Sequence, residues 1–210
     1  MIEYWKKNIL ESWNIFSRNY ILLLAPCILL LLIVYYVGAN IEDEYMSTPK
    51  LILILALSII GLGIHIGAIS ITYNAIINKK IVFRDIFQKF HLLHLILIPQ
   101  IVIFAILFIM LNILPISGYV FILIAVILYA VFLFFYDYLI IIENLSMKDA
   151  IIKNYHIVSK YPQIILQFML VSFLIGFCLT VFPLIGTMLS MCFVRIVGIK
   201  LFLMLSNQSK

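Results

Sequence analysis

The chain has 210 residues, of which 66% are apolar and 11% are charged, and its formal net charge is +5. Charged residues make up about a quarter of an average soluble domain, so this composition excludes a soluble globular protein and predicts an integral membrane protein. Since one membrane-spanning helix needs roughly 20 apolar residues, the chain has room for about six spans. We therefore expect a single membrane domain over residues 1–210.

An amphipathic segment precedes the first long apolar stretch. Its apolar side chains fall on one side of a helical wheel, and its charged and amide side chains, Lys7, Glu11, Asn14 and Arg18, fall on the other. The apolar side holds Ile2, Trp5, Ile9, Trp13 and Phe16. This arrangement is typical of a helix that lies in the membrane interface.

Six apolar stretches follow, each long enough to cross about 30 Å of hydrocarbon. They cover residues 20–39, 51–77, 93–113, 119–142, 162–182 and 185–205. The connections within the three successive pairs are short, and two of them hold proline and glycine, which stop helices where a hairpin must turn. We predict an all-α fold, a polytopic membrane helical bundle of six spans arranged as three hairpins.

Amphipathic segments also precede the third and the fifth span. The first of these, residues 81–91, is short. In the second, Ser146 and Asp149 match a capping box at the start of a helix. A largely apolar stripe follows at Met147, Ala150, Ile151, Asn154 and Val158. Pro162 then stands at the start of the fifth span, where its missing N–H costs little.

The three amphipathic segments share a pattern at constant spacing. Ile15, Ile86 and Ile157 lie 71 residues apart, and each is followed by an apolar residue, a small or amide residue and a base. Repeats on this scale indicate architecture. We therefore predict three units, each a cytoplasmic amphipathic helix followed by a hairpin, over residues 1–77, 78–142 and 143–210.

Lysine and arginine residues gather on one side of the predicted spans. The opposite loops hold Lys50, whereas the other side holds Lys6, Lys7, Arg18, Lys79, Lys80, Arg84, Lys89, Lys148, Lys153, Lys160 and Lys210. By the positive-inside rule this bias predicts a multi-pass protein of the cell membrane with both termini in the cytoplasm. It also explains the positive charge without nucleic acid. Inner-leaflet lipid contacts are expected at Lys6, Lys7, Arg18, Lys89 and Lys160.

Ionisable residues inside the predicted spans are costly and therefore mark candidate functional positions. They are Arg195, Lys200, Asp137 and His65. Counting along the helices places Asp137 and Lys200 at similar depth, where they form an ion pair or reach the inner surface. Arg195 falls near mid-membrane. Its guanidinium either contacts an anion or a lipid phosphate in a cavity, or it reaches inward toward Asp137.

Several other residues in the spans have structural interpretations. Gly63 and Gly67, on either side of His65, predict a face for close helix packing. Pro99 and Gln100 predict a kink and an amide that satisfies the freed backbone. The three cysteines lie inside apolar stretches, at Cys27, Cys178 and Cys192. We expect them to be small core residues, and we predict no catalytic, metal or cofactor site.

One stretch of the chain carries a resemblance to known proteins. From Ile141 to Ile151, Glu143 and a short linker precede an amphipathic helix that contains Ala150. Over residues 136–205 this order resembles a group of uncharacterised prokaryotic six-span proteins, which are similar to the membrane domain attached to some glycerophosphodiester phosphodiesterases. The catalytic domain of those enzymes has no counterpart here. The resemblance therefore implies an all-helical bundle and carries over no activity.

Together these patterns predict a non-enzymatic integral membrane protein that organises lipid or a partner protein at the inner leaflet. Motifs for phosphate loops, zinc proteases, nucleophile elbows and dinucleotides are not found in the sequence. The expected partners are membrane lipids of anionic type, with a protein partner as a second possibility. The alternative is a small transporter or permease subunit, with a polar path near Arg195.

Overall fold

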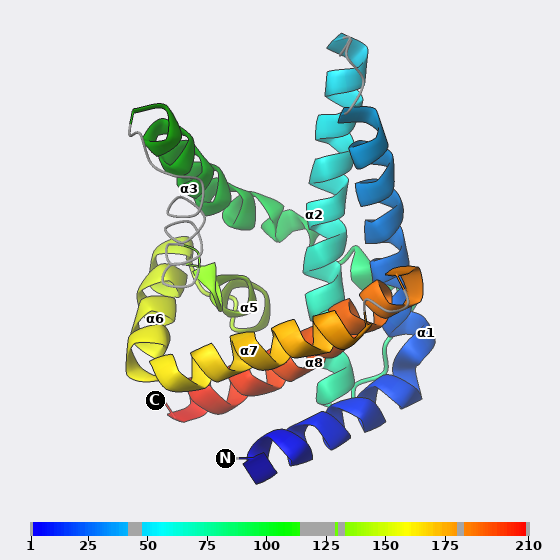
Figure 1. The fold of residues 1–210 in the computed structure, drawn as a ribbon, viewed down its shortest axis with the longest axis vertical. Helices are drawn as coiled ribbons and strands as arrows, with labels where there is room; N and C mark the ends of the chain where they lie inside the picture. The colour runs from blue at the N-terminus through cyan, green and yellow to red at the C-terminus, as the bar shows by residue number, and fades with distance from the viewer. Residues whose placement is uncertain (1, 42–47, 114–128, 130–132, 180–182, 209–210) are drawn as a thin grey trace. The chain divides into compact units, whose positions relative to one another are not determined.

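The computed structural model describes residues 2–41, 48–113, 129, 133–179 and 183–208, and these residues are mostly helical (Figure 1). The long helices are α1 (Ile2–Ile41), α2 (Thr48–Ile76), α3 (Leu93–Ile113), α7 (Pro162–Leu179) and α8 (Pro183–Gln208). The short elements are η1 (Phe83–Ile86), η2 (Phe90–Leu92), α5 (Tyr136–Ile142) and α6 (Met147–Lys160). The predicted all-α fold is confirmed over these residues.

Four helical stretches in the described part of the chain are long and apolar enough to cross a membrane. They are Trp5–Ala39, Thr48–Ile76, Phe83–Ile103 and Ile185–Gln208, and the number is five if α6 and α7 form one bent span. The chain is therefore a membrane protein by the length and apolarity of its helices. The prediction of a span at 119–142 falls largely on positions outside the described residues.

The chain forms two compact units. Unit 1 holds residues 1–90 and 168–201, and unit 2 holds residues 91–167 and 202–210. Both units thus combine segments that are far apart in the sequence. The threefold division into repeat units stays a prediction.

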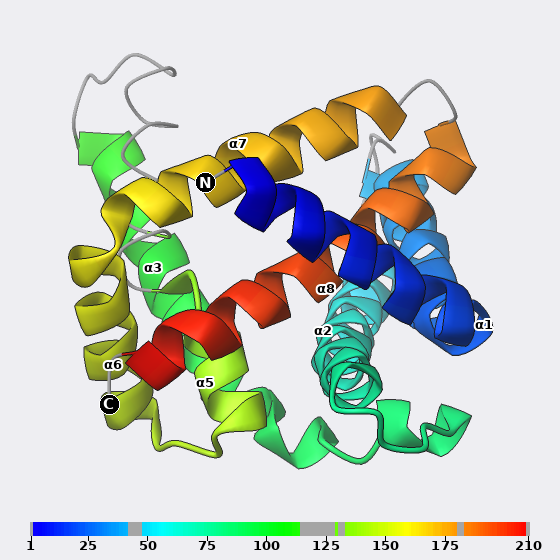
Figure 2. The same cartoon turned by 90° about the horizontal axis from the view of Figure 1, so that it is seen from below.

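In unit 1, α1 bends at Asn19, whose φ of −128° and ψ of 16° leave the helical region. The Asn19 amide donates to the carbonyl of Ile15 at 3.1 Å, a local bond of the kind that competes with the helix ladder. We call residues 2–18 the N-terminal segment and residues 20–41 the C-terminal segment. The C-terminal segment lies beside α2 (Figures 1 and 2). The bend falls where the sequence predicts the change from interfacial helix to first span.

The N-terminal segment packs against residues 168–201 of unit 1 (Figure 2). Trp5 stacks on Phe168 with ring centroids 6.5 Å apart. Asn8, Ser12 and Phe16 follow one another at helical spacing and are buried, while Trp13 is 56% exposed. Residues 168–201 therefore cover part of the helix face that was predicted to contact lipid. A helical wheel shows which residues share a face, but it does not show whether lipid or protein covers that face.

The connection after α2 differs from the amphipathic α-helix predicted at 81–91. It forms the two short 3₁₀ helices η1 and η2 instead. The backbone at Ile86 lies directly against Gly67 of α2, so a methyl group on Gly67 would overlap the Ile86 carbonyl. The ring of Phe90 lies against Gly63 in the same way, within 2.6 Å of the position that a Cβ atom on Gly63 would take. The two glycines allow close packing as predicted, but they pack against this connection.

In unit 2, α6 begins and ends at the residues that the sequence marks. The Ser146 hydroxyl caps the helix by accepting the Asp149 N–H at 3.3 Å. Helix α6 ends at Lys160, and the chain turns by 92° into α7, which starts at Pro162. Proline suits this position because the first N–H groups of a helix have no intrahelical acceptor. Both predictions are confirmed.

Helix α3 contains Pro99, which has no N–H to donate to the carbonyl of Leu95 four residues earlier. The hydroxyl of Tyr136 in α5 donates to that carbonyl at 2.6 Å. The prediction was that the neighbouring Gln100 amide satisfies the freed backbone carbonyl. A tyrosine from another helix does so, and it ties α5 to α3.

Candidate functional site

Exposed bases and exposed apolar side chains occur together on the N-terminal segment of α1. Lys6, Lys7 and Arg18 are exposed, and Leu10 and Trp13 are 57% and 56% exposed. A tryptophan beside lysine and arginine is the combination that anchors helices at headgroup level. We call these five residues the basic surface.

The other two predicted lipid contacts have different surroundings. Lys89 is half-buried. In unit 2, Lys160 is exposed, and its Nζ donates to the Gln208 carbonyl at 3.2 Å and lies 5.3 Å from the centre of the Tyr161 ring. Lys160 therefore ties the end of α6 to the end of α8, which is a structural role.

The four residues of the predicted polar path fall in both units. Lys200 pairs with Glu11 of the N-terminal segment, with Nζ and Oε2 2.5 Å apart. His65 lies in α2 and is half-buried. Arg195 is buried in unit 1, and Asp137 belongs to unit 2. Glu11 was not predicted as a partner of Lys200, because 189 residues separate the two.

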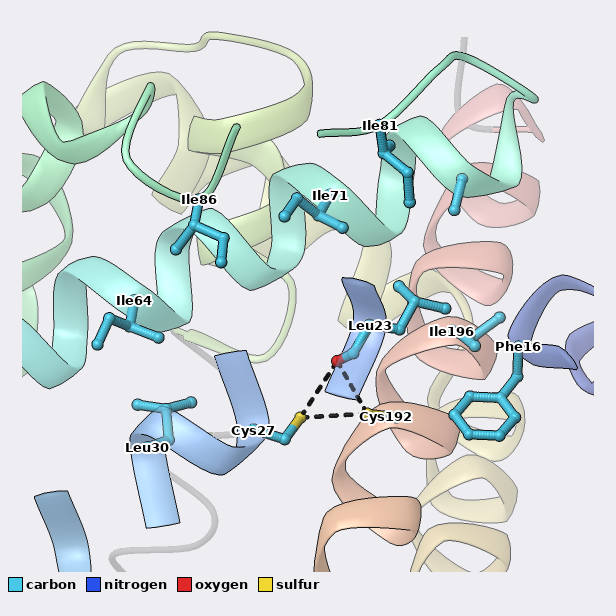
Figure 3. Packing of buried hydrophobic residues seen from close by; sticks show 11 residues of the cluster. Phe16, Leu23, Cys27, Leu30, Ile64, Ile71, Ile81, Ile86, Cys192 and Ile196 are labelled. Carbon is cyan, nitrogen blue, oxygen red and sulfur yellow. Dashed lines mark hydrogen bonds between the residues drawn. The ribbon is translucent and has the colours of Figure 1, made fainter. Parts of the chain in front are cut away.

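Arg195 contacts sulfur (Figure 3 shows the surrounding cluster). Its Nη1 donates to Cys27 Sγ at 3.7 Å, and Cys27 Sγ lies 3.2 Å from Cys192 Sγ. Both thiols donate to the carbonyl of Leu23, Cys192 at 3.1 Å and Cys27 at 3.7 Å. Cys27 and Cys192 are thus core residues as expected, but their contact with each other was not predicted. Nothing in the sequence pairs two cysteines 165 residues apart.

An apolar cavity of about 370 Å³ lies in unit 1, between the N-terminal segment and residues of α7 and α8. Its lining consists of apolar and sulfur-containing side chains: Trp13, Phe16, Leu174, Ile175, Cys178, Leu189 and Phe193. Phe16 also belongs to the buried cluster that holds Cys27 and Cys192. The cavity therefore shares Phe16 with the cluster around the sulfur pair, and its lining does not include Cys27 or Cys192.

Known proteins give no guide to this site. No family model, curated protein or solved structure matches the chain. Among the described residues, no group of three or more histidine, cysteine, aspartate or glutamate side chains could hold a metal ion.

Glu143 and Ala150, which carry the sequence resemblance, have structural surroundings in unit 2. Glu143 accepts hydrogen bonds from Lys153 at 2.6 Å and from the Ser206 hydroxyl at 2.5 Å. Ala150 is fully buried on the inner face of α6, together with Asn154. A carboxylate that joins α6 to the end of α8 stabilises the fold of unit 2.

Proposed function

We propose that this chain is a non-enzymatic protein of the cell membrane that organises anionic lipid at the inner leaflet, with both termini in the cytoplasm. The observation that carries the proposal is the basic surface, in which exposed Leu10 and Trp13 lie among exposed Lys6, Lys7 and Arg18. Such a surface binds headgroups by burying apolar side chains and attracting negative charge.

The charges also favour an in-plane orientation of the N-terminal segment. Lys6 and Arg18 are exposed near its two ends, about 18 Å apart at about 1.5 Å per residue. If the segment crossed the membrane, one of these charges would face hydrocarbon, which is costly. In the plane of the interface, both charges reach headgroups.

This orientation has a consequence for the last predicted hairpin. Residues 168–201 pack along the N-terminal segment, from Trp5, which stacks on Phe168, to Phe16, which lines the same cavity as Phe193. In the proposal they lie beside it at the interface, and Lys200 pairs there with Glu11. The proposal thus differs from the six-span prediction in its last two spans.

The test is lipid retention by native mass spectrometry of the purified protein, offered phosphatidylglycerol or phosphatidylcholine. At about 1 kcal/mol per base, the triple variant Lys6→Gln, Lys7→Gln, Arg18→Gln should lose about 3 kcal/mol of binding, or roughly a hundredfold in affinity for phosphatidylglycerol. Affinity for phosphatidylcholine should stay the same.

The control variant removes the same charge elsewhere in unit 1. Lys79, Lys80 and Arg84 are also exposed, and changing all three to glutamine should leave the preference for phosphatidylglycerol near the wild-type value. If the control loses as much affinity as the triple variant, net charge and not the basic surface determines binding. If neither variant loses affinity, the proposal is wrong.

A further inference from the structure

We propose that Cys27 and Cys192 are a redox-active dithiol, which a membrane-soluble quinone oxidises to a disulfide between α1 and α8. The two sulfur atoms are 3.2 Å apart, and the side chains are 0% and 2% exposed. A disulfide bond is about 2.05 Å long, so the sulfurs need to approach by only about 1 Å.

The position of Arg195 distinguishes this pair from two thiols that merely fill space. Arg195 is 7% exposed, and its hydrogen bond in the described part of the chain goes to Cys27 Sγ. A buried guanidinium is costly unless an anion faces it. When Cys27 gives up the proton that it donates to the Leu23 carbonyl at 3.7 Å, its thiolate supplies that anion, and a thiolate is the nucleophile of disulfide chemistry.

The reaction balances with the quinone as the acceptor. Two S–H bonds break and one S–S bond forms, so the dithiol gives up two electrons and two protons. The quinone takes up both and becomes the quinol. The Cys27 thiolate adds to a carbonyl carbon of the quinone and forms a C–S bond. The Cys192 sulfur then attacks Cys27 Sγ, so that the S–S bond forms while the C–S bond breaks and its electron pair passes to the ring. The two quinone oxygens take up the two protons, and the quinol leaves.

The surroundings of the pair favour an apolar oxidant. Both sulfurs lie in a cluster of buried apolar residues, where water-soluble oxidants have little access (Figure 3). A cavity of about 370 Å³, which shares Phe16 with this cluster, is apolar and is lined by three aromatic side chains, Trp13, Phe16 and Phe193. Its volume lies within the range of small-molecule sites, about 300–1,000 Å³, and aromatic side chains can stack on a quinone ring.

The experiment uses the full chain in lipid nanodiscs, first reduced and then mixed with a short-chain, fully substituted benzoquinone, which cannot alkylate thiols at the ring. We expect the intact mass to fall by two hydrogen atoms, one quinol to form per chain, and peptide mapping to join Cys27 to Cys192. Oxidised glutathione, which is water-soluble, should react far more slowly.

Cysteine variants decide which sulfurs react. Cys27→Ser and Cys192→Ser should each abolish quinol formation, while Ser58→Ala in α2, at a residue outside the sulfur pair and the cavity lining, should leave it unchanged. Arg195→Gln should slow the reaction roughly tenfold, and Arg195→Lys should retain most of the rate. Circular dichroism and size-exclusion chromatography establish that each variant is folded.

The proposal is wrong if the folded wild-type chain forms no disulfide, or if the disulfide includes Cys178. An unchanged rate in folded Arg195→Gln protein would overturn the role of the guanidinium. None of these variants alters Lys6, Lys7 or Arg18. Failure of this chemistry therefore leaves the lipid preference intact, and the two proposals can be tested separately.

Discussion

Replacing Tyr136 by phenylalanine tests how unit 2 tolerates a proline inside α3. The variant keeps the ring, which is fully buried, and removes the hydroxyl that donates to the Leu95 carbonyl at 2.6 Å. Pro99 cannot donate to that carbonyl, so the Leu95 carbonyl has no hydrogen-bond donor in the variant. A buried polar group without a partner costs about 1–3 kcal/mol. We expect the free energy of unfolding, measured by equilibrium denaturation in mixed micelles, to fall by that amount.

The matched control is Pro99→Ala, which restores a backbone N–H four residues after Leu95. In that background the Leu95 carbonyl has an intrahelical partner, so Tyr136→Phe should cost little. A double-mutant cycle over the two positions should therefore give a coupling energy of roughly 1–2 kcal/mol. Equal costs of Tyr136→Phe in both backgrounds would refute the account.

Two other substitutions test packing and capping. Gly67→Ala should lower the melting temperature in detergent, because overpacking costs about 1–3 kcal/mol and outweighs the gain in helix propensity of about 1 kcal/mol. Gly61→Ala is the control, since its new methyl group would lie 3.6 Å from Ile33; equal melting temperatures would contradict the close approach at Gly67. Ser146→Ala should cost about 1 kcal/mol and speed amide hydrogen exchange in the first turn of α6. Unchanged exchange there would rule out the cap.

Local features of the fold follow from the sequence. The bend of α1 at Asn19 coincides with the change from the amphipathic segment to the first continuous apolar stretch. The bounds of α6 follow from Ser146 and Pro162, whose effects on a helix depend on the nearest turn alone. These are short-range effects, and a single sequence contains the information for them.

Contacts between distant segments do not follow from the sequence. Burial of Asn8 and Ser12, in preference to Trp13, depends on helices that follow more than a hundred residues later. The pairs Glu11–Lys200 and Cys27–Cys192 depend on the same packing. Membrane sequences make such contacts hard to predict, because lipid and protein interior are both apolar, and an apolar face can meet either.

Unit 1 consists of two separate segments of the chain, residues 1–90 and 168–201. This division limits the order in which the protein can fold. The ribosome must synthesise residues 91–167 before the second part of unit 1 exists. At about 5–20 residues per second this takes roughly 4–15 s. During that time residues 168–201, which pack against Trp5 and Phe16 of the N-terminal segment, do not yet exist. The growing protein therefore depends on lipid, or on the insertion machinery, to shield these two side chains until α8 is made.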